Sequence, residues 1–334
     1  MKNGKALLVL LFLASCTLLG APPADAVEIH ESEEVRIEIR ALFEAGWGLA
    51  SEQSSRVSGP RVGMARLSAR AEYFELGRVL VQYEAAPENA RLLDALGVLY
   101  IFDGLELRLG YFKTPISQDF NISASRKPFP SRAQTADLTP RRKRGSELRY
   151  TRSLDTNQLR IGVGLFDLGP LTAVSTNLLG LTVHGEFELP PGLTFHASYL
   201  ENFFQPQSPM EPSDELPFYL TQPRLFDLGA RYGDENFYAH LEVVFAPVDT
   251  LVPTALYAAF GLRLGDYDQE PTLEPIVGYD LRRELNSELS HRVRAGINAY
   301  LLDNRFVPNL HYEAQFQSSA PVGHAVFALL RIGI

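Results

Sequence analysis

Cysteine is almost absent from this sequence of 334 residues, which contains only Cys16. A single cysteine cannot form a disulfide within the chain, so the sequence is not that of a small exported fold held together by disulfides. The seven histidines occur singly, with neither a His-x-x-x-His pair nor a cysteine cluster beside them. No glycine-rich phosphate loop precedes a predicted helix. The sequence therefore predicts neither a metal ion nor another cofactor.

Long apolar runs are missing as well. After residue 26, no segment approaches the run of about 18 apolar residues that a membrane-spanning helix needs. The one apolar run near the start, residues 6–19, is too short to span a membrane, and it follows the basic residues Lys2 and Lys5. The small residues Ala24-Asp25-Ala26 supply a cleavage site. We predict that residues 1–26 are a secretory signal peptide that is removed.

A second interpretation of this leader rests on Leu13-Ala14-Ser15-Cys16, which resembles a lipoprotein box. In such a box the cysteine becomes the lipidated first residue of the mature protein. Because the apolar run continues past Cys16 and the Ala24-Asp25-Ala26 site follows, we expect cleavage after Ala26. Lipidation of Cys16 stays open as the alternative.

Apolar and polar residues alternate through almost all of residues 27–334. This period of two is that of a β-strand rather than a helix. In the first strand, the apolar face comprises Val35, Ile37, Ile39, Ala41, Phe43, Ala45, Trp47 and Leu49. The segment from Leu92 to Phe102 is apolar on both faces apart from Asp94, which leaves its register open. About sixteen such segments, joined alternately by short turns and longer loops, predict one all-β domain: a transmembrane antiparallel β-barrel.

The direction of the polar faces decides between a soluble barrel and a membrane barrel. In a membrane barrel the apolar faces meet lipid and the polar faces line the lumen. The polar faces here carry glycines and charges of both signs, whereas a soluble sandwich would have a more uniform Val, Ile and Leu core and would tend to split into two domains. We predict a barrel in the bacterial outer membrane, with arginines and glutamates paired across neighbouring strands. Its predicted lumen-lining residues are Arg66, Arg70, Arg78, Arg108, Glu72, Glu84 and Glu106.

One basic segment, from Leu105 to Arg152, interrupts the alternation. Residues 113–152 hold ten lysines and arginines but only three acids, a net charge of +7. The whole chain carries −9, and removal of Lys2, Lys5 and Asp25 with the leader leaves −10, so the remainder carries −17. A positive constriction between low-dielectric walls enriches anions regardless of the total charge. We predict that residues 113–144 form a constriction loop inside the barrel.

This segment also carries a family resemblance. The stretch Gly110-Tyr111-Phe112-Lys113-Thr114-Pro115, followed by Arg126-Lys127-Pro128 and by Arg141-Arg142-Lys143-Arg144-Gly145, resembles the phosphate-selective porin O/P family. The resemblance covers about forty residues, and it implies a trimer of sixteen-stranded, anion-preferring pores. Its candidate constriction residues are Lys113, Arg126, Lys127, Arg132, Arg141, Arg142, Lys143 and Arg144. The expected partners are outer-membrane lipid with lipopolysaccharide and small anionic solutes, and not nucleic acid.

Three alternatives to an anion-preferring porin follow from the same residues. A run such as Arg141 to Arg144 is also typical of a solvated loop or of a patch that binds lipid phosphates. The barrel would then be a non-conducting structural or assembly protein, with the basic loop as a plug. His196 and Ser198 share one strand face, with a spacing similar to that of outer-membrane phospholipase. Because Phe195, Ala197 and Tyr199 mark the opposite face as lipid-facing, we expect no enzyme.

Overall fold

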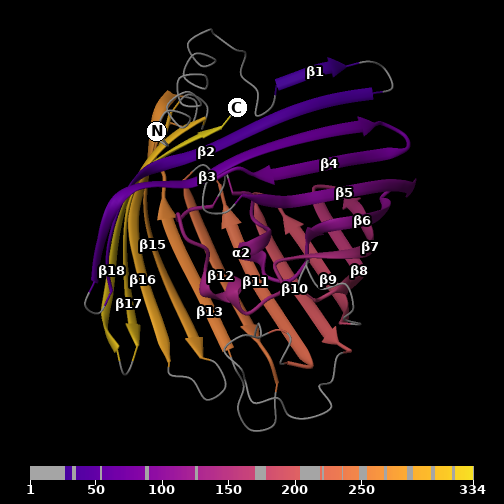
Figure 1. Cartoon of the computed structure of the whole chain (residues 1–334). Helices are drawn as coiled ribbons and strands as arrows, with labels where there is room; N and C mark the ends of the chain where they lie inside the picture. Colours follow the sequence, from indigo (N-terminus) through magenta and orange to yellow (C-terminus); the bar gives the residue numbers. More distant parts are fainter. Residues whose placement is uncertain are drawn as a thin grey trace.

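A closed ring of sixteen antiparallel β-strands forms the body of the protein in the computed structural model (Figure 1). The ring strands are β2 (Val35–Glu52), β3 (Ser55–Tyr73), β4 (Gly77–Glu84), β5 (Arg91–Phe102), β6 (Leu105–Lys113), β7 (Arg142–Leu154), β8 (Asn157–Asp167), β9 (Leu179–Leu189), β10 (Leu193–Asn202), β11 (Arg224–Gly233), β12 (Phe237–Phe245), β13 (Thr254–Leu262), β15 (Gln269–Arg283), β16 (Ser290–Tyr300), β17 (Phe306–Gln317) and β18 (Ala320–Gly333). Each strand pairs with its neighbours along the chain, and β18 pairs with β2 to close the ring. The predicted barrel of about sixteen strands is confirmed.

Two short strands lie outside this count. β1 (Val27–Glu31) pairs with the first residues of β2, and β14 (Leu264–Asp266) continues the line of β13 along β15. The structure describes residues 27–31, 35–52, 55–86, 90–124, 127–169, 178–203, 219, 222–234, 236–247, 254–266, 269–283, 289–301, 305–317 and 320–333. The predicted signal peptide, including Cys16, lies outside the described residues. Within these ranges, no helix is both long and apolar enough to cross a membrane.

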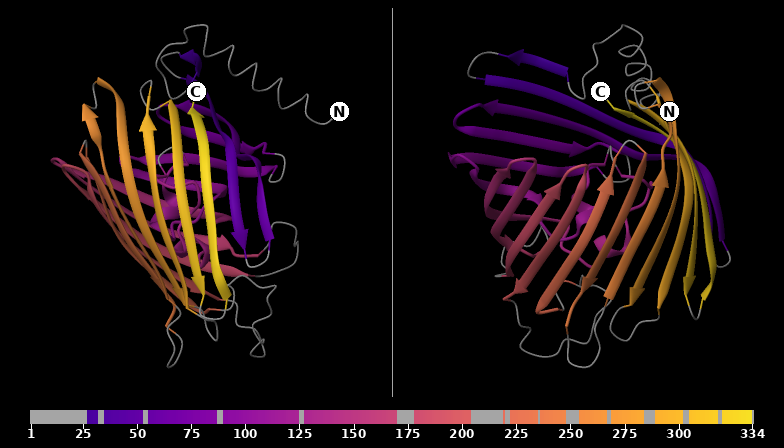
Figure 2. Two further views of the ribbon diagram at one scale, coloured as in Figure 1. Left: turned by 90° about the vertical axis from the view of Figure 1, so that its left-hand side faces the viewer. Right: turned by 180° about the vertical axis from the view of Figure 1, so that it is seen from behind.

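The outer face of the ring is an apolar band. Side chains such as Leu67 and Val277 are 55% and 56% exposed although they are apolar. They alternate along their strands with inward polar residues, as a strand with one lipid-facing side requires. Figure 2 shows the strands tilted around the ring, and exposed apolar side chains occur on strands all around it, from Val79 of β4 to Val326 of β18. An apolar outside with a polar inside is the arrangement of a membrane barrel rather than of a soluble one.

Strand β5, whose register the sequence left open, is apolar on both faces because its inward face also packs against apolar side chains. Leu99 and Ile101 point outward and are more than half exposed, whereas Leu96 and Val98 point inward and are buried. Inside the barrel they pack with Phe112 and other apolar residues of β6, β8, β10 and β11. An apolar cluster inside a predicted water-filled lumen shows that part of the interior is occupied by chain.

Candidate functional site

The basic loop, residues 114–141, occupies the interior of the barrel (Figure 1). It contains two short helical turns that the strand periodicity did not predict, α2 (Gln118–Asn121) and η1 (Gln134–Asp137). Ser117 begins α2, where its hydroxyl accepts a hydrogen bond of 3.2 Å from the amide of Phe120. Its φ of 68° lies in the left-handed region, which is unfavourable for a residue with a side chain. Contacts outside α2 therefore have to hold this turn.

Carboxylates on the far wall of the barrel accept hydrogen bonds from the loop backbone. All three carboxylates belong to completely buried side chains. The amide and carboxylate pairs are Ser117 with Asp227 of β11 (3.0 Å), Asp119 with Glu242 of β12 (2.8 Å) and Gln134 with Asp280 of β15 (3.0 Å). A hydrogen bond to a charged group contributes about 1.5–3 kcal/mol, and a buried charge without a partner is strongly destabilising. The loop and the wall charges therefore stabilise each other.

The same wall also donates hydrogen bonds to carbonyl groups of the loop. The donors are side chains of β16 and β18, which face the lumen. They are Arg292 to the carbonyl of Arg132, Arg294 to that of Ser131 (3.3 Å), Asn298 to that of Pro128 (3.1 Å) and Arg331 to that of Lys127 (3.3 Å). We refer to strands β11 to β18 as the loop wall. The loop wall holds the loop mainly through the loop's backbone.

Apolar contacts complete the attachment. Ile116, Phe129 and Leu138 of the loop are at most 1% exposed and pack into clusters on the inner face. Phe129 lies directly over Gly278 of β15, where a Cβ would come within 2.7 Å of a ring carbon. Gly278 therefore provides the space that the ring fills. The predicted constriction loop lies in the lumen as a packed element.

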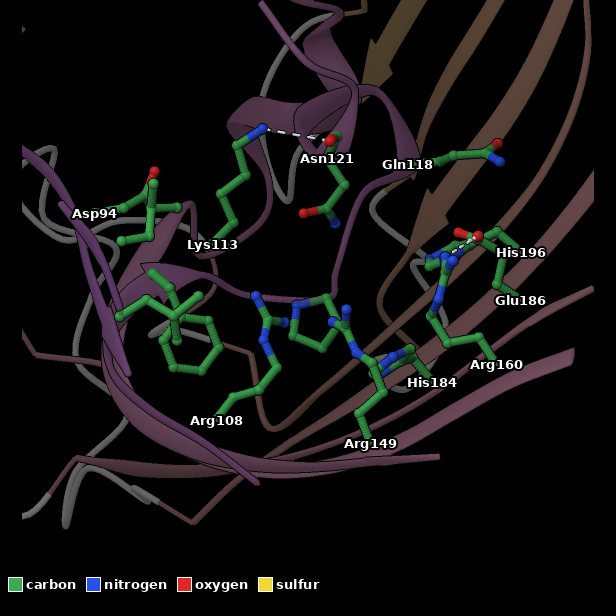
Figure 3. Close-up of a pocket in the computed structure, with 14 residues that line it drawn as sticks. Asp94, Arg108, Lys113, Gln118, Asn121, Arg149, Arg160, His184, Glu186 and His196 are labelled. Carbon is green, nitrogen blue, oxygen red and sulfur yellow. Dashed lines mark hydrogen bonds and ion pairs between the residues drawn. The ribbon is translucent and has the colours of Figure 1, made fainter. Parts of the chain in front are cut away.

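A cavity of about 330 Å³ separates the loop from the opposite side of the barrel (Figure 3). Figure 3 shows basic side chains of β6, β7 and β8 on one side of this cavity and Gln118 and Asn121 of the loop on another. The lining residues are Leu80, Asp94, Leu96, Arg108, Phe112, Lys113, Pro115, Gln118, Asn121, Arg149, Arg160, His184, Glu186 and His196. Four of them are lysine or arginine and two are acidic, so the lining carries an excess of positive charge.

Six inward arginines of β3, β4, β6, β7 and β8 form what we call the arginine row. The row comprises Arg66, Arg70, Arg78, Arg108, Arg149 and Arg160. Each member has a glutamate partner on its own strand or on one of the next two strands. Arg78 of β4 reaches across β5 to Glu106 of β6 at 3.6 Å, and Arg108 and Arg149 both pair with Glu147, at 2.8 and 2.9 Å. All seven predicted lumen-lining residues lie on inward faces, with Arg66 bound to Glu84, Arg70 to Glu72 and Arg78 to Glu106. The row is thus fixed in place by its own glutamates.

Three of the predicted constriction residues surround the ring of Phe120. Lys113 Nζ, Arg132 Cζ and Arg142 Cζ lie 5.4, 5.7 and 5.5 Å from its centroid. Cation–π contacts of this kind contribute about 0.5–2 kcal/mol. Arg142 also pairs with Asp94 of β5 at 3.0 Å. The structure therefore gathers three cations around one aromatic side chain at the edge of the cavity.

Two other predicted constriction residues, Lys127 of the loop and Lys143 of β7, are buried away from the cavity. Lys127 lies 3.8 Å from Glu44 of β2, and burial lowers the pKa of Lys127 to about 8 although Glu44 favours the charged form. Lys143 of β7 donates to the carbonyls of Leu168 and Gly169, at 2.6 and 2.9 Å. Both ammonium groups are engaged with the protein, and neither lines the cavity.

The remaining members of the basic run lie away from the cavity. β7 begins at Arg142, whereas the predicted constriction loop extends to residue 144, so the run belongs partly to a strand. Strand alternation then places Arg144 on the outer face, where it pairs with Asp167 at 2.7 Å. Arg141 is an exposed loop residue paired with Asp137. Arg126 lies outside the described residues.

The sequence analysis did not single out several residues that line the cavity, among them Arg149, Arg160, His184 and Gln118. Arg149 and Arg160 continue the arginine row, and they could have been found because they alternate with the outward residues Leu148 and Ile161. His184 of β9 follows the same alternation beside the outward Val183, whereas Gln118 gave no such signal. Gln118 lies in the irregular loop, where no periodicity predicts the direction of a side chain.

His196 and Ser198 of β10 both contact the carboxylate of Asp227, at 2.9 and 3.2 Å. The structure describes no hydrogen bond between the two side chains themselves, whereas nucleophilic catalysis requires the base to contact the hydroxyl. Asp227 also receives the amide of Ser117, so this group anchors the loop. Among the described residues, no cluster of histidine, cysteine and acidic side chains could hold a metal ion.

Comparison with known proteins found neither a matching family model nor a matching curated protein. Solved structures share the fold. The anion-selective porin from Comamonas acidovorans is 11% identical, with a TM-score of 0.65, over 90% of this chain and 100% of that one. OmpF of Salmonella typhi in complex with daunomycin is 13% identical, with a TM-score of 0.60, over 92% and 100%. The trimer form of OmpT, an outer membrane protein of Vibrio cholerae, is 11% identical, with a TM-score of 0.57, over 90% and 100%.

The chain has the barrel fold of these outer-membrane proteins. Identities this low reflect a shared fold, and the apolar outer band is that of a barrel surrounded by lipid. This agrees with the outer-membrane location predicted from the sequence.

Proposed function

We propose that this protein is a water-filled diffusion channel of the outer membrane with a preference for small anions. The observation that supports this proposal is the cavity beside the basic loop, where Lys113, at the end of β6, lines the same space as Arg108, Arg149 and Arg160. Cations that line a narrow passage between low-dielectric walls raise the local concentration of anions. Arginine is also suited to binding oxyanions through two parallel hydrogen bonds.

Phosphate is one candidate solute under this proposal. The stretch from Gly110 to Pro115 resembles the phosphate-selective porin O/P family, and one neighbour in fold is described as an anion-selective porin. We further propose a homotrimer, which the trimer form of OmpT supports by analogy of fold. Lipopolysaccharide and other outer-membrane lipids are the proposed surroundings of the outer band.

Planar bilayers containing the purified protein test the channel and its preference together. We expect discrete conductance steps and, in a potassium chloride gradient, a reversal potential on the chloride side. A cation-side reversal potential would contradict the anion preference, and a protein that refolds but gives no conductance would contradict the channel.

Matched variants locate the preference within the lumen. Replacing Arg149 and Arg160 together by glutamine removes two cavity charges, so the preference for chloride should fall. Arg144→Gln removes one charge from the outer face and should leave it unchanged. Equal effects of the two changes would indicate a property of the overall charge rather than of the cavity.

A non-conducting barrel plugged by its loop is the second candidate. The complete burial of Ile116 and Leu138 supports it, because a plug has to be packed against the wall. The two functions differ in what removal of the loop does. A plugged barrel should begin to conduct when residues 118–138 are replaced by a short glycine-serine linker, whereas a channel should already conduct with the loop present.

A further inference from the structure

The two ends of the barrel differ in the length of their connections. At one end the chain turns within a few residues, as between β3 and β4, β5 and β6, and β7 and β8. The other end carries the basic loop and the long connections that follow β8, β10 and β12. Outer-membrane barrels have short periplasmic turns and longer extracellular loops. The end with the long connections, which we call the loop end, is therefore the extracellular one.

The last residue of β15, Arg283, lies on the outer face at the loop end. Its neighbour Arg282 points inward, where its guanidinium lies 3.8 Å from the carboxylate of Asp137. Because successive side chains of a strand point to opposite faces, Arg283 points outward, and it is exposed. Among the described residues, no carboxylate pairs with Arg283.

Other outward arginines at the loop end are neutralised within the sheet. Arg144 of β7 pairs with Asp167 of β8 at 2.7 Å. Arg224 of β11 pairs with Glu201 of β10 at 3.1 Å. A cation at the edge of a lipid-facing surface loses part of its hydration, so a partner of opposite charge stabilises it. Arg283 differs from these two arginines because its charge is left for a partner outside the chain.

Two pairs of tyrosine and histidine lie on the same outer face. Tyr279 Oη lies 2.6 Å from Nδ1 of His291, and Tyr312 Oη lies 2.7 Å from Nδ1 of His324. Each pair joins neighbouring strands, β15 with β16 and β17 with β18, at the same diagonal position. The hydrogen bond occupies Nδ1 and orients the ring, which leaves Nε2 for another partner. In the described part of the chain, neither Nε2 has one.

The strand register joins these residues into one row. His291 lies opposite Leu281, which is two residues from Arg283 on the same face. His291 also lies opposite Phe316 of β17, and Phe316 is a diagonal neighbour of His324 on β18. Diagonal neighbours are about 7–8 Å apart, within reach of long side chains. Strands β15 to β18 lie side by side, coloured orange to yellow in Figure 2. We call the row that crosses them, Arg283, His291, Phe316 and His324, the rim row.

Another part of the loop end has an aromatic row without cations. Tyr199, Phe226 and Phe245 of β10 to β12 lie with successive ring centroids 4.9 and 5.2 Å apart. Aromatic side chains in this position form the girdle that barrels have at the membrane interface. A girdle therefore needs neither histidine nor arginine. The cations and free ring nitrogens of the rim row are a feature that a girdle does not explain.

Apolar side chains continue from the rim row toward the middle of the membrane. Val293, Ile297 and Val326 of the same strands are 43%, 49% and 38% exposed on the outer face. A ligand at the rim row thus meets charge and hydrogen-bond donors at the extracellular edge and hydrocarbon below it. Arginine binds a phosphate through two parallel hydrogen bonds. A lipid with a phosphate in its headgroup satisfies both parts, whereas free inorganic phosphate satisfies only the first.

We propose that the rim row is a binding site for the phosphorylated headgroup of a lipid of the outer leaflet. The row spans three strand spacings, about 14 Å, which is more than one phosphate can bridge. Arg283 and His291 therefore bind the phosphate, and Nε2 of His324 donates to a further polar group of the headgroup. Tyr279 and Tyr312 are positioning residues that orient the two imidazole rings. The site gives the proposed outer-membrane lipids a defined place on the barrel, and it does not depend on conduction through the lumen.

Native mass spectrometry of the full barrel, refolded in detergent, tests this site. The probes are lipid A with both phosphates, the same lipid without phosphates, and inorganic phosphate. We expect one tightly bound lipid A per chain, with a dissociation constant about tenfold below that of the dephosphorylated lipid, since charge-assisted hydrogen bonds are lost with the phosphates. Inorganic phosphate in large excess should not displace the lipid.

Matched variants locate the site. Arg283→Gln should weaken binding of lipid A about tenfold, and Arg283→Lys, which keeps the charge, should recover most of it. His291→Phe removes one donor while keeping an aromatic ring, and should weaken binding about threefold. Arg224→Gln is the control, because this outward arginine of the loop end is already paired with Glu201. It should leave the dissociation constant unchanged.

Three results would overturn the proposed lipid site. They are equal binding of lipid A with and without phosphates, equal losses in Arg283→Gln and Arg224→Gln, and displacement of lipid A by inorganic phosphate, which would indicate a site for the free anion. His291→Phe changes a different strand, so it decides the question if Arg283→Gln does not refold. Reversal potentials measure the ion preference of the lumen separately, so the loss of this site would leave the proposed channel intact.

Discussion

Both sides of the lumen carry inward charged side chains, and the two sides neutralise these charges with different partners. On the arginine row, inward charges are paired within the sheet, as in Arg66 with Glu84. On the loop wall, Asp280 pairs with Arg292 and Arg294 of β16, at 3.0 and 2.8 Å, whereas Asp227 and Glu242 have no arginine partner among the described residues and accept loop amides. The loop therefore covers the part of the wall where buried carboxylates lack an arginine partner. Three arginines of the row opposite, Arg108, Arg149 and Arg160, line the cavity.

Removing the loop should abolish this difference between the two sides of the lumen and should have the largest effect on ion selectivity. Replacing residues 118–138 by a short glycine-serine linker removes Lys127 and Arg132 and uncovers Asp227 and Glu242. Several unit charges near the ion path, each contributing about 0.5 kcal/mol in a water-like dielectric, should lower the anion-to-cation permeability ratio roughly tenfold. Reversal potentials measure this ratio, and an unchanged far-ultraviolet circular dichroism spectrum would show that the barrel still folds. An unchanged ratio would contradict a selective role for the loop.

Neutralising charges of the arginine row, on the opposite side of the lumen, should have the next largest effect on ion selectivity. The double change of Arg149 and Arg160 to glutamine removes two charges about 7 Å from a passing ion, which corresponds to about 1 kcal/mol, or roughly a fivefold fall in the permeability ratio. The measurement is the reversal potential at low salt, since screening weakens the effect at high salt. Arg144→Gln on the outer face is the matched control. A fall as large in that control would show that the row has no special role.

A single added methyl group should loosen the attachment of the loop. Gly278→Ala places a Cβ against the ring of Phe129, and overpacking of this kind costs about 1 kcal/mol when the neighbour can shift. We expect a lower unfolding temperature and noisier single-channel currents. Gly185→Ala is the control, because a Cβ there meets nothing within 4 Å. Identical behaviour of the two variants would contradict the packing of Phe129 on β15.

The smallest expected effect is a change of the anion preference with pH. The pKa of Lys127 is lowered to about 8 by burial, so its ammonium group is charged at pH 7 and loses its proton as the pH rises to 9. Loss of one charge should reduce the anion preference about twofold over this interval. The dependence should be weaker in Lys127→Met, measured by reversal potentials at each pH. An equally steep dependence in that variant would assign it to another group.

The fold was largely predictable from the sequence, because strand alternation determines both the number of strands and the face of each residue. The exception was β5, where Leu96 and Val98 point inward and pack with Phe112 beneath the loop. Two apolar faces give no period-two signal. The start of β7 was also misplaced, since the alternation of Arg142, Lys143 and Arg144 is hidden by their common charge.

The site was only partly predictable. A basic loop was expected, but its position depends on partners far away in sequence: Gln134 and Asp280 are 146 residues apart. No local sequence pattern links residues that are this far apart in the chain. Arg149 and Arg160 could have been included, since both follow the alternation of their strands, whereas the direction of Gln118 depends on the fold of an irregular segment.

The attachment of the loop through its backbone has a consequence for how this protein can change. Amides and carbonyls are present whatever the side chain, so the bonds from Asp227, Asp280 and Arg331 do not depend on which residues the loop carries. Substitutions at Gln118, whose side-chain amide has no hydrogen-bond partner among the described residues, can therefore accumulate without detaching the loop, whereas the Asn121 amide donates to the carbonyls of Thr114 and Ser117 and holds the turn. The loop wall therefore holds the loop in place whichever side chains the loop carries toward the cavity. Substitutions on that side of the loop, natural or engineered, can then change which solute permeates.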